Sequence, residues 1–117
     1  MTDPRDADDG ALSPRTSRAV ATMAARITGL FPGCPDAIAR SAALRWSRTC
    51  APRLQEREAR VTHPDTVRAA LAEEVRWTRT DWPARVQSGR TDPLARRRVA
   101  AQVRDVLAAW KDPAPAG

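Results

Sequence analysis

Cations placed beside indole rings are the residues with the clearest chemical potential in this sequence. The stretch RWTRTDW at residues 76–82 alternates Arg76 and Arg79 with Trp77 and Trp82. Arginine forks onto phosphate oxygens and tryptophan offers a ring on which bases stack, so this pattern is typical of a nucleic-acid surface. The alternative is that both indoles pack into the core while the arginine stems cover their rings.

A second group of cations follows in the run Arg96-Arg97-Arg98, with Arg104 further along. On a helix the three consecutive arginines point to different sides, so they cannot form one binding face by themselves. A phosphate-binding surface must therefore draw on both groups. The predicted nucleic-acid-binding residues are Arg76, Arg79, Arg96, Arg97 and Arg104.

The overall charge supports the same hypothesis without specifying a ligand. The 117 residues carry a net charge of +6, and Lys111 is the one lysine among 20 basic residues. A basic surface is the electrostatic footprint of a nucleic-acid partner. Because alanine and arginine are both abundant, a GC-rich coding sequence is the competing explanation, with arginine simply replacing lysine on solvated faces.

The residue types needed for catalysis or metal binding are nearly absent. The sequence shows no nucleophile beside a base, no carboxylate pair in apolar surroundings and no phosphate-cradling glycine loop. Cys34, Cys50 and His63 are spread too widely, and are too few, for a structural zinc site. We therefore expect a protein that is not an enzyme and uses no metal or cofactor, with both cysteines as reduced thiols.

The hydropathy pattern places the chain away from membranes. No apolar run approaches the roughly 20 residues that a membrane-spanning helix needs. The first ten residues are acidic and polar, the reverse of a basic, apolar signal peptide. We expect a cytoplasmic protein without a membrane partner.

Helices must position these residues, because alanine is the strongest helix former and apolar residues recur with helical spacing. The sequence predicts an all-α fold, a compact bundle of four to five short helices. We expect one helical domain at residues 17–111, a disordered acidic tail at 1–16 and a disordered tail at 112–117. The expected helices cover residues 18–28, 35–48, 63–77, 80–89 and 93–111, with Gly29 capping the first.

The apolar spacing indicates which side of two helices is buried. In the third helix Val67, Leu71 and Val75 form one stripe. In the last helix Arg97 and Arg104 face water, and Arg96 lies at the edge of the buried face. That buried face consists of Ala95, Val99, Val103, Val106, Leu107 and Trp110.

Several short stretches resemble, in order and spacing, the domain-of-unknown-function family numbered 2293: residues 31–35, 75–82, 89, 95–99 and 106–110. The residues that match its pattern are Arg76, Thr80, Gly89, Ala95, Arg96, Leu107 and Trp110. Trp77 stands where the family has histidine, Trp82 where it has tyrosine and Asp92 where it has arginine. The resemblance implies a helical fold over about residues 28–111 and singles out Arg76 and Arg96, but it implies no activity.

Two functions remain open from the sequence. The leading hypothesis is a small basic protein that binds DNA or RNA phosphates through the predicted arginines. The alternative is a protein–protein interaction module or homodimer without a nucleic-acid role. A thin core and four tryptophans favour that alternative, with Trp46 or Trp82 lining an exposed apolar patch.

Overall fold

The computed structural model describes residues 12–49 and 63–113, and in these ranges the chain forms helices and turns without a strand. The elements are α2 (Pro14–Leu30), α3 (Asp36–Thr49), α5 (Pro64–Arg79), α6 (Trp82–Gln87) and α7 (Pro93–Trp110). The predicted all-α bundle is therefore confirmed. No helix in the described ranges is both long and apolar enough to cross a membrane. Most of both predicted tails, and residues 50–62, lie outside these ranges.

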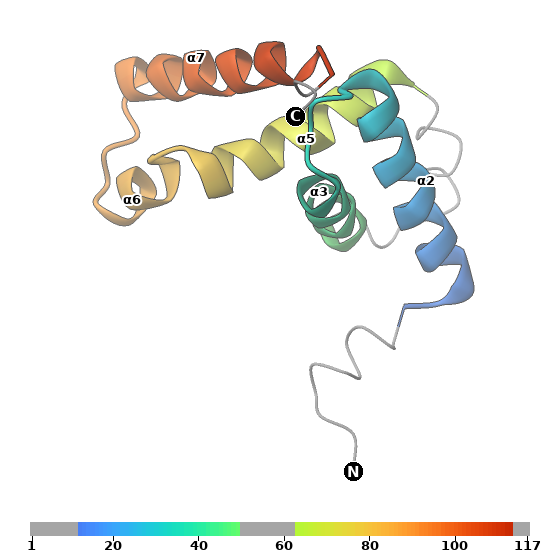
Figure 1. Ribbon diagram of the computed structural model, residues 1–117. Coiled ribbons are helices and arrows are strands. Elements are labelled where there is room, and N and C mark those ends of the chain that lie inside the picture. The colour runs from blue at the N-terminus through green and yellow to red at the C-terminus, as the bar shows by residue number, and fades with distance from the viewer. Residues whose placement is uncertain (1–11, 50–62, 114–117) are drawn as a thin grey trace.

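The core lies where α2, α3 and α5 meet, and Figure 1 shows α3 between the other two helices. Met23 and Ile27 of α2 are fully buried there, as are Val67, Leu71 and Val75 of α5. The predicted stripe of α5 is thus confirmed. α3 contributes small side chains that let its neighbours approach closely, namely Ala39, Ala42 and Ala43.

The ends of α2 differ from the sequence prediction. Ser13 caps the helix by accepting a 3.0 Å hydrogen bond from the Thr16 amide, and Pro14 suits the first turn. Residues 14–16 are therefore helical, although the sequence assigned them to the tail. The cap predicted at Gly29 is wrong, because the helix continues to Leu30 and the Phe31 amide donates to the Ile27 carbonyl.

Local hydrogen bonds explain where the later helices begin and end. His63 caps α5, with its Nδ1 accepting from the Asp65 amide, and Asp92 caps α7 by accepting from the Ala95 amide at 2.7 Å. Gly89 follows α6 with φ +73°. There the Arg90 amide donates to the Arg85 carbonyl, as in a Schellman turn.

The tryptophans divide between the core and the surface. Trp46 is only 8% exposed and packs in the core, so the predicted exposed patch at Trp46 is wrong. Trp77 and Trp82 are half-buried and lie outside the main core cluster, contrary to the alternative in which both pack into it. Two large aromatics are consequently left near the surface, at the α5–α6 corner.

The last helix lies along α5 and runs back in the opposite direction (Figure 1). Leu107 anchors it in the main core, and the Gly33 amide donates to the Trp110 carbonyl at 2.9 Å. Toward its other end Ala95 and Val99 are buried outside the main core cluster. α7 is thus held near both ends, and a groove runs between it and α5.

Candidate functional site

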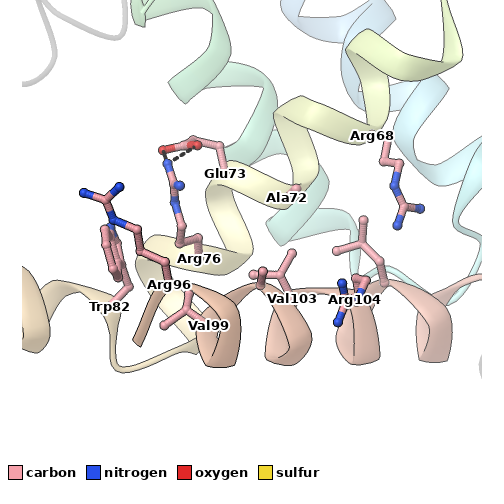
Figure 2. A pocket seen from close by; sticks show the side chains of 11 residues that line it. Arg68, Ala72, Glu73, Arg76, Trp82, Arg96, Val99, Val103 and Arg104 are labelled. Carbon is pink, nitrogen blue, oxygen red and sulfur yellow. Dashed lines mark hydrogen bonds and ion pairs between the residues drawn. The ribbon is translucent and has the colours of Figure 1, made fainter. Parts of the chain in front are cut away.

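A groove of about 490 Å³ lies between α5 and α7, closed at one end by Trp82 of α6 (Figure 2). Its floor is aliphatic, with most of the apolar side chains coming from α7. The floor residues are Ala72, Val99, Ala100, Val103 and Leu107.

Four arginines line the rim of this groove, two from each helix. Arg68 and Arg76 are eight residues apart on α5, and Arg96 and Arg104 are eight apart on α7. Eight residues of helix rise about 12 Å, so each wall carries cations at two separated levels. Figure 2 shows Arg76 and Arg96 toward one end of the groove and Arg68 and Arg104 toward the other.

Arg76 is already engaged by neighbouring side chains. Its Nη2 donates to both carboxylate oxygens of Glu73, at 2.5 and 2.6 Å. Its Cζ lies 6.0 Å from the ring centroid of Trp77 and 5.8 Å from that of Trp82. Its Nε is buried without an acceptor among the described residues, a cost that these cation–π contacts partly offset. Arg76 therefore joins α5 to α6, and its guanidinium already has one carboxylate partner.

Glu73 is held in its charged form by the same contacts. Partial burial alone would raise the pKa of its carboxyl group. Hydrogen bonds from Arg76 and from the Trp77 indole, at 2.6 Å, outweigh that effect and keep the pKa below its ordinary value. The carboxylate therefore stays paired with Arg76 at neutral pH.

Thr80 sets the position of Trp82 at the end of the groove. Its hydroxyl donates to the Arg76 carbonyl and accepts from the Trp82 amide at 3.1 Å. This arrangement ends α5 at Arg79 and begins α6 at Trp82, each two residues later than the sequence predicts. The indole is thereby brought to the groove beside Arg96 (Figure 2).

The remaining rim arginines lack an internal counter-charge. Arg68, Arg96 and Arg104 are exposed, and no carboxylate in the described part of the chain forms an ion pair with them. Glu73 is the one acidic residue in the groove lining, and Arg76 neutralises it. The groove is therefore strongly cationic at its rim and apolar at its floor.

Two predicted site residues lie elsewhere. Arg79 borders a separate depression between α3 and α5, and its Cζ is 5.5 Å from the ring centroid of Trp110. Arg97 is exposed on α7, as predicted, but lies outside the groove lining. The structure thus brings Arg76, Arg96 and Arg104 to one groove and leaves Arg79 and Arg97 outside it.

Arg68 lines the groove but is not among the residues predicted from the sequence. A signal was available, because Arg68 follows Val67 by one residue just as Arg76 follows Val75. Residues 68, 72 and 76 therefore form a stripe beside the buried one, turned by about 100° around α5. The sequence of α5 alone does not show which helix packs next to that stripe.

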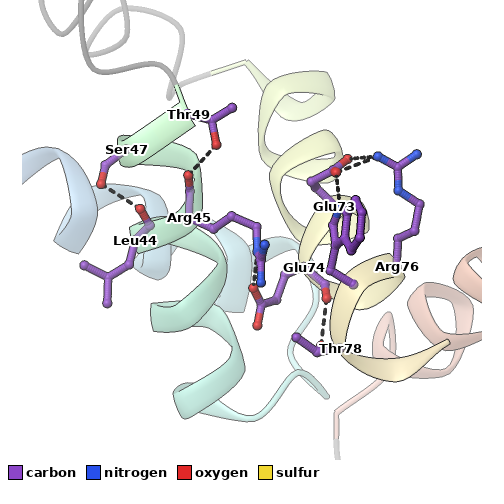
Figure 3. Close-up of polar contacts among 9 residues, drawn as sticks. Leu44, Arg45, Ser47, Thr49, Glu73, Glu74, Arg76 and Thr78 are labelled. Atoms are coloured by element: carbon purple, nitrogen blue, oxygen red, sulfur yellow. Dashed lines mark hydrogen bonds and ion pairs between the residues drawn. The ribbon is translucent and has the colours of Figure 1, made fainter. Parts of the chain in front are cut away.

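A second polar cluster joins α3 to α5 but is internally satisfied (Figure 3). Glu74 is only 4% exposed and accepts a 2.7 Å hydrogen bond from Arg45 Nε. Thr78 donates to the Glu74 carbonyl. Because each charge has its partner, this cluster stabilises the α3–α5 contact. In the described ranges, no three His, Cys, Asp or Glu side chains are grouped so as to hold a metal ion.

Comparisons with models of protein families, with curated proteins and with solved structures found no match for this chain. The resemblance to the family numbered 2293 therefore stays a prediction.

Proposed function

We propose that the protein is a small, non-enzymatic binding protein that holds an anionic macromolecule in the groove between α5 and α7. The observation that carries this proposal is the rim, where Arg68, Arg96 and Arg104 project from two helices without internal carboxylate partners in the described ranges. An anionic ligand neutralises these charges without breaking an existing ion pair. Arginine is suited to this role because its planar fork matches carboxylate and phosphate groups.

The groups in the groove favour binding over catalysis. Guanidinium groups stay protonated, so they hold anions but do not exchange protons. The carboxylate of Glu73 is tied to Arg76, and the one histidine, His63, is occupied in capping α5. We keep the cytoplasm as the proposed location, which suits the buried free thiol of Cys34.

Two classes of ligand fit an anion-binding groove. Nucleic acid is favoured by the net charge of +6 and by exposed arginines beside Trp82. A protein partner is favoured by the aliphatic floor, which offers burial to apolar side chains. The first experiment therefore tests the groove without presupposing the ligand class.

Fluorescence anisotropy tests the proposal with three labelled probes: single-stranded DNA, double-stranded RNA and a poly-glutamate peptide. We expect at least one probe to bind, with an affinity that falls steeply as salt is raised. The double variant Arg68→Glu, Arg104→Glu should weaken that binding by about tenfold or more, since each reversal places a negative charge on the rim.

The matched control is the double variant Arg97→Glu, Arg98→Glu. It makes the same change in net charge at two exposed residues of α7 outside the groove lining. Its effect should be clearly smaller than that of the rim variant. Equal losses of affinity in both variants would indicate a diffuse basic surface and contradict a groove site. If none of the three probes binds at low salt, the groove site is also contradicted.

A further inference from the structure

The floor of the α5–α7 groove is built for apolar contact. Its α7 lining runs from Val99 to Leu107, but these two side chains are almost fully buried, at 2% and 1% exposure. Half-buried Val103 and exposed Ala100 leave apolar surface that a partner can cover. Phosphate groups gain nothing from such surface, because their affinity comes from charge.

The groove also lacks a continuous platform for bases. Single-stranded nucleic acids stack successive bases on aromatic side chains. Trp82 lies at one end only, and the guanidinium of Arg76 is 5.8 Å from its ring centroid. A single-stranded nucleic acid would find charge at the rim but aliphatic surface where its bases need rings.

The spacing of the rim arginines matches the length of a short helix. A docked helix presents apolar side chains at i, i+3 or i+4 and i+7, and the middle of that stripe lies over Ala72, Ala100 and Val103. Acidic side chains on its two flanks lie about two turns apart, close to the 12 Å spacing of the arginine pairs. One such helix therefore provides carboxylate partners for arginines on both walls of the groove.

We propose, building on the function proposed above, that the ligand of this groove is an acidic amphipathic α-helix presented by a protein partner. Its apolar stripe packs on Ala72, Ala100 and Val103, and its flanking carboxylates pair with Arg68, Arg96 and Arg104. Arg76 does not join these pairs, because Glu73 already holds it. The end of the groove with Arg68 and Arg104 therefore attracts more acidic charge than the end with Arg96.

Three labelled peptides of about 16 residues test this inference by anisotropy. The first is helical, with leucines at i, i+4 and i+8 and glutamates on both flanks. The second replaces the leucines by serine at the same charge, and the third replaces the glutamates by glutamine. The first should bind at least about tenfold more tightly than either of the others. The second lacks the apolar contacts with the floor, and the third lacks the charges that pair with the rim arginines.

Two variants with the same charge change distinguish an effect at the groove floor from an effect of net charge. Ala100→Glu places a bulky anion on the groove lining at an exposed residue, where the fold tolerates it. Gln102→Glu makes the same charge change at an exposed residue outside the lining. Ala100→Glu should reduce binding of the first peptide by about tenfold or more, and Gln102→Glu should leave it nearly unchanged.

The outcomes distinguish this inference from the proposed function. If the serine peptide binds as tightly as the leucine peptide, the floor does not contribute to binding. That result overturns this inference but leaves the anion-binding function standing. If single-stranded DNA binds more tightly than the leucine peptide and Ala100→Glu abolishes that binding, the ligand is a nucleic acid. If no anionic probe responds to Arg68→Glu, Arg104→Glu, the groove itself is not the site and both proposals fail.

Discussion

At the scale of single residues, Cys34 shows how burial changes a side chain's chemistry. Its side chain is nearly buried in the turn before α3, and its Sγ lies 3.5 Å from the Pro35 carbonyl. Desolvation raises the pKa of the thiol to about 11, although the nearby charge of Arg79 acts in the opposite direction. The folded protein therefore keeps this proton at pH values where an unfolded chain releases it.

This retained proton predicts that the free energy of unfolding falls as pH rises from about 9 to about 11. In that interval the folded state binds more protons than the unfolded state, so alkali favours unfolding by an amount on the order of 2 kcal/mol. Urea unfolding followed by tryptophan fluorescence measures it in a Cys50→Ser background. The chain has no tyrosine and a single lysine, so few other groups titrate there.

Cys34→Ala in the same background is the comparison. It should show a much flatter dependence of unfolding free energy on pH, since the shifted thiol has been removed. A slope that persists undiminished in Cys34→Ala would assign the alkaline effect to another group.

The arginines show what could be predicted at this scale and what could not. Helical periodicity correctly placed Arg96 at the edge of a buried face and Arg104 toward solvent, and both line the groove. It could not place Arg79, because the side to which that residue points depends on α3 crossing α5. Nor could it show that Arg76 is neutralised, since a pairing with Glu73 competes with solvent in any isolated helix.

At the scale of elements, α7 depends on the cap at Asp92. Its side chain accepts from the Ala95 amide at 2.7 Å and satisfies one of the unpaired donors of the first turn. We expect Asp92→Ala to lower the free energy of unfolding by about 1 kcal/mol, and Asp92→Asn to retain most of the cap. Thermal unfolding by circular dichroism checks both variants, and equal losses in the two would contradict the capping role.

The helix ends that the sequence predicted well are those marked by local hydrogen bonding. α5 was expected from residue 63 and α7 from residue 93, and they begin at Pro64 and Pro93, where His63 and Asp92 act as caps within a few residues. α6 was expected at residues 80–89 and is shorter, Trp82–Gln87, with Gly89 after it at a positive φ. Gly29 was misassigned because a glycine resembles a cap wherever it stands near an expected end. The helix continues past it, and burial of Phe31 (3% exposed) accompanies the actual end at Leu30.

At the scale of the whole molecule, the turn between α2 and α3 meets the end of α7. The Gly33 amide donates a hydrogen bond to the Trp110 carbonyl, and Leu107, one turn earlier on α7, is part of the main core. This contact joins the first part of the described chain to the last. Because α7 forms one wall of the groove, the groove depends on this distant contact as well as on its own lining.

The closeness of the two backbones at Gly33 predicts a specific cost for adding one methyl group there. A Cβ on Gly33 would lie 2.4 Å from the Asp112 carbonyl oxygen and 3.0 Å from Trp110 Cα, so the end of α7 would have to move. We expect Gly33→Ala to lower the free energy of unfolding by about 1–3 kcal/mol, measured by urea unfolding.

Gly29→Ala is the matched control, because its Cβ would meet no described atom within 4 Å and the residue lies inside α2. It should stabilise the protein by about 0.5–1 kcal/mol, since alanine loses less backbone entropy than glycine in a helix. Opposite signs for the same chemical change would show that the packing of α7 onto the α2–α3 turn, and not glycine's flexibility, is what Gly33 provides. Gly33→Ala should then also weaken any ligand of the α5–α7 groove, although residue 33 does not line it. An unchanged stability and an unchanged affinity in that variant would mean that α7 is held by its contact with α5 alone.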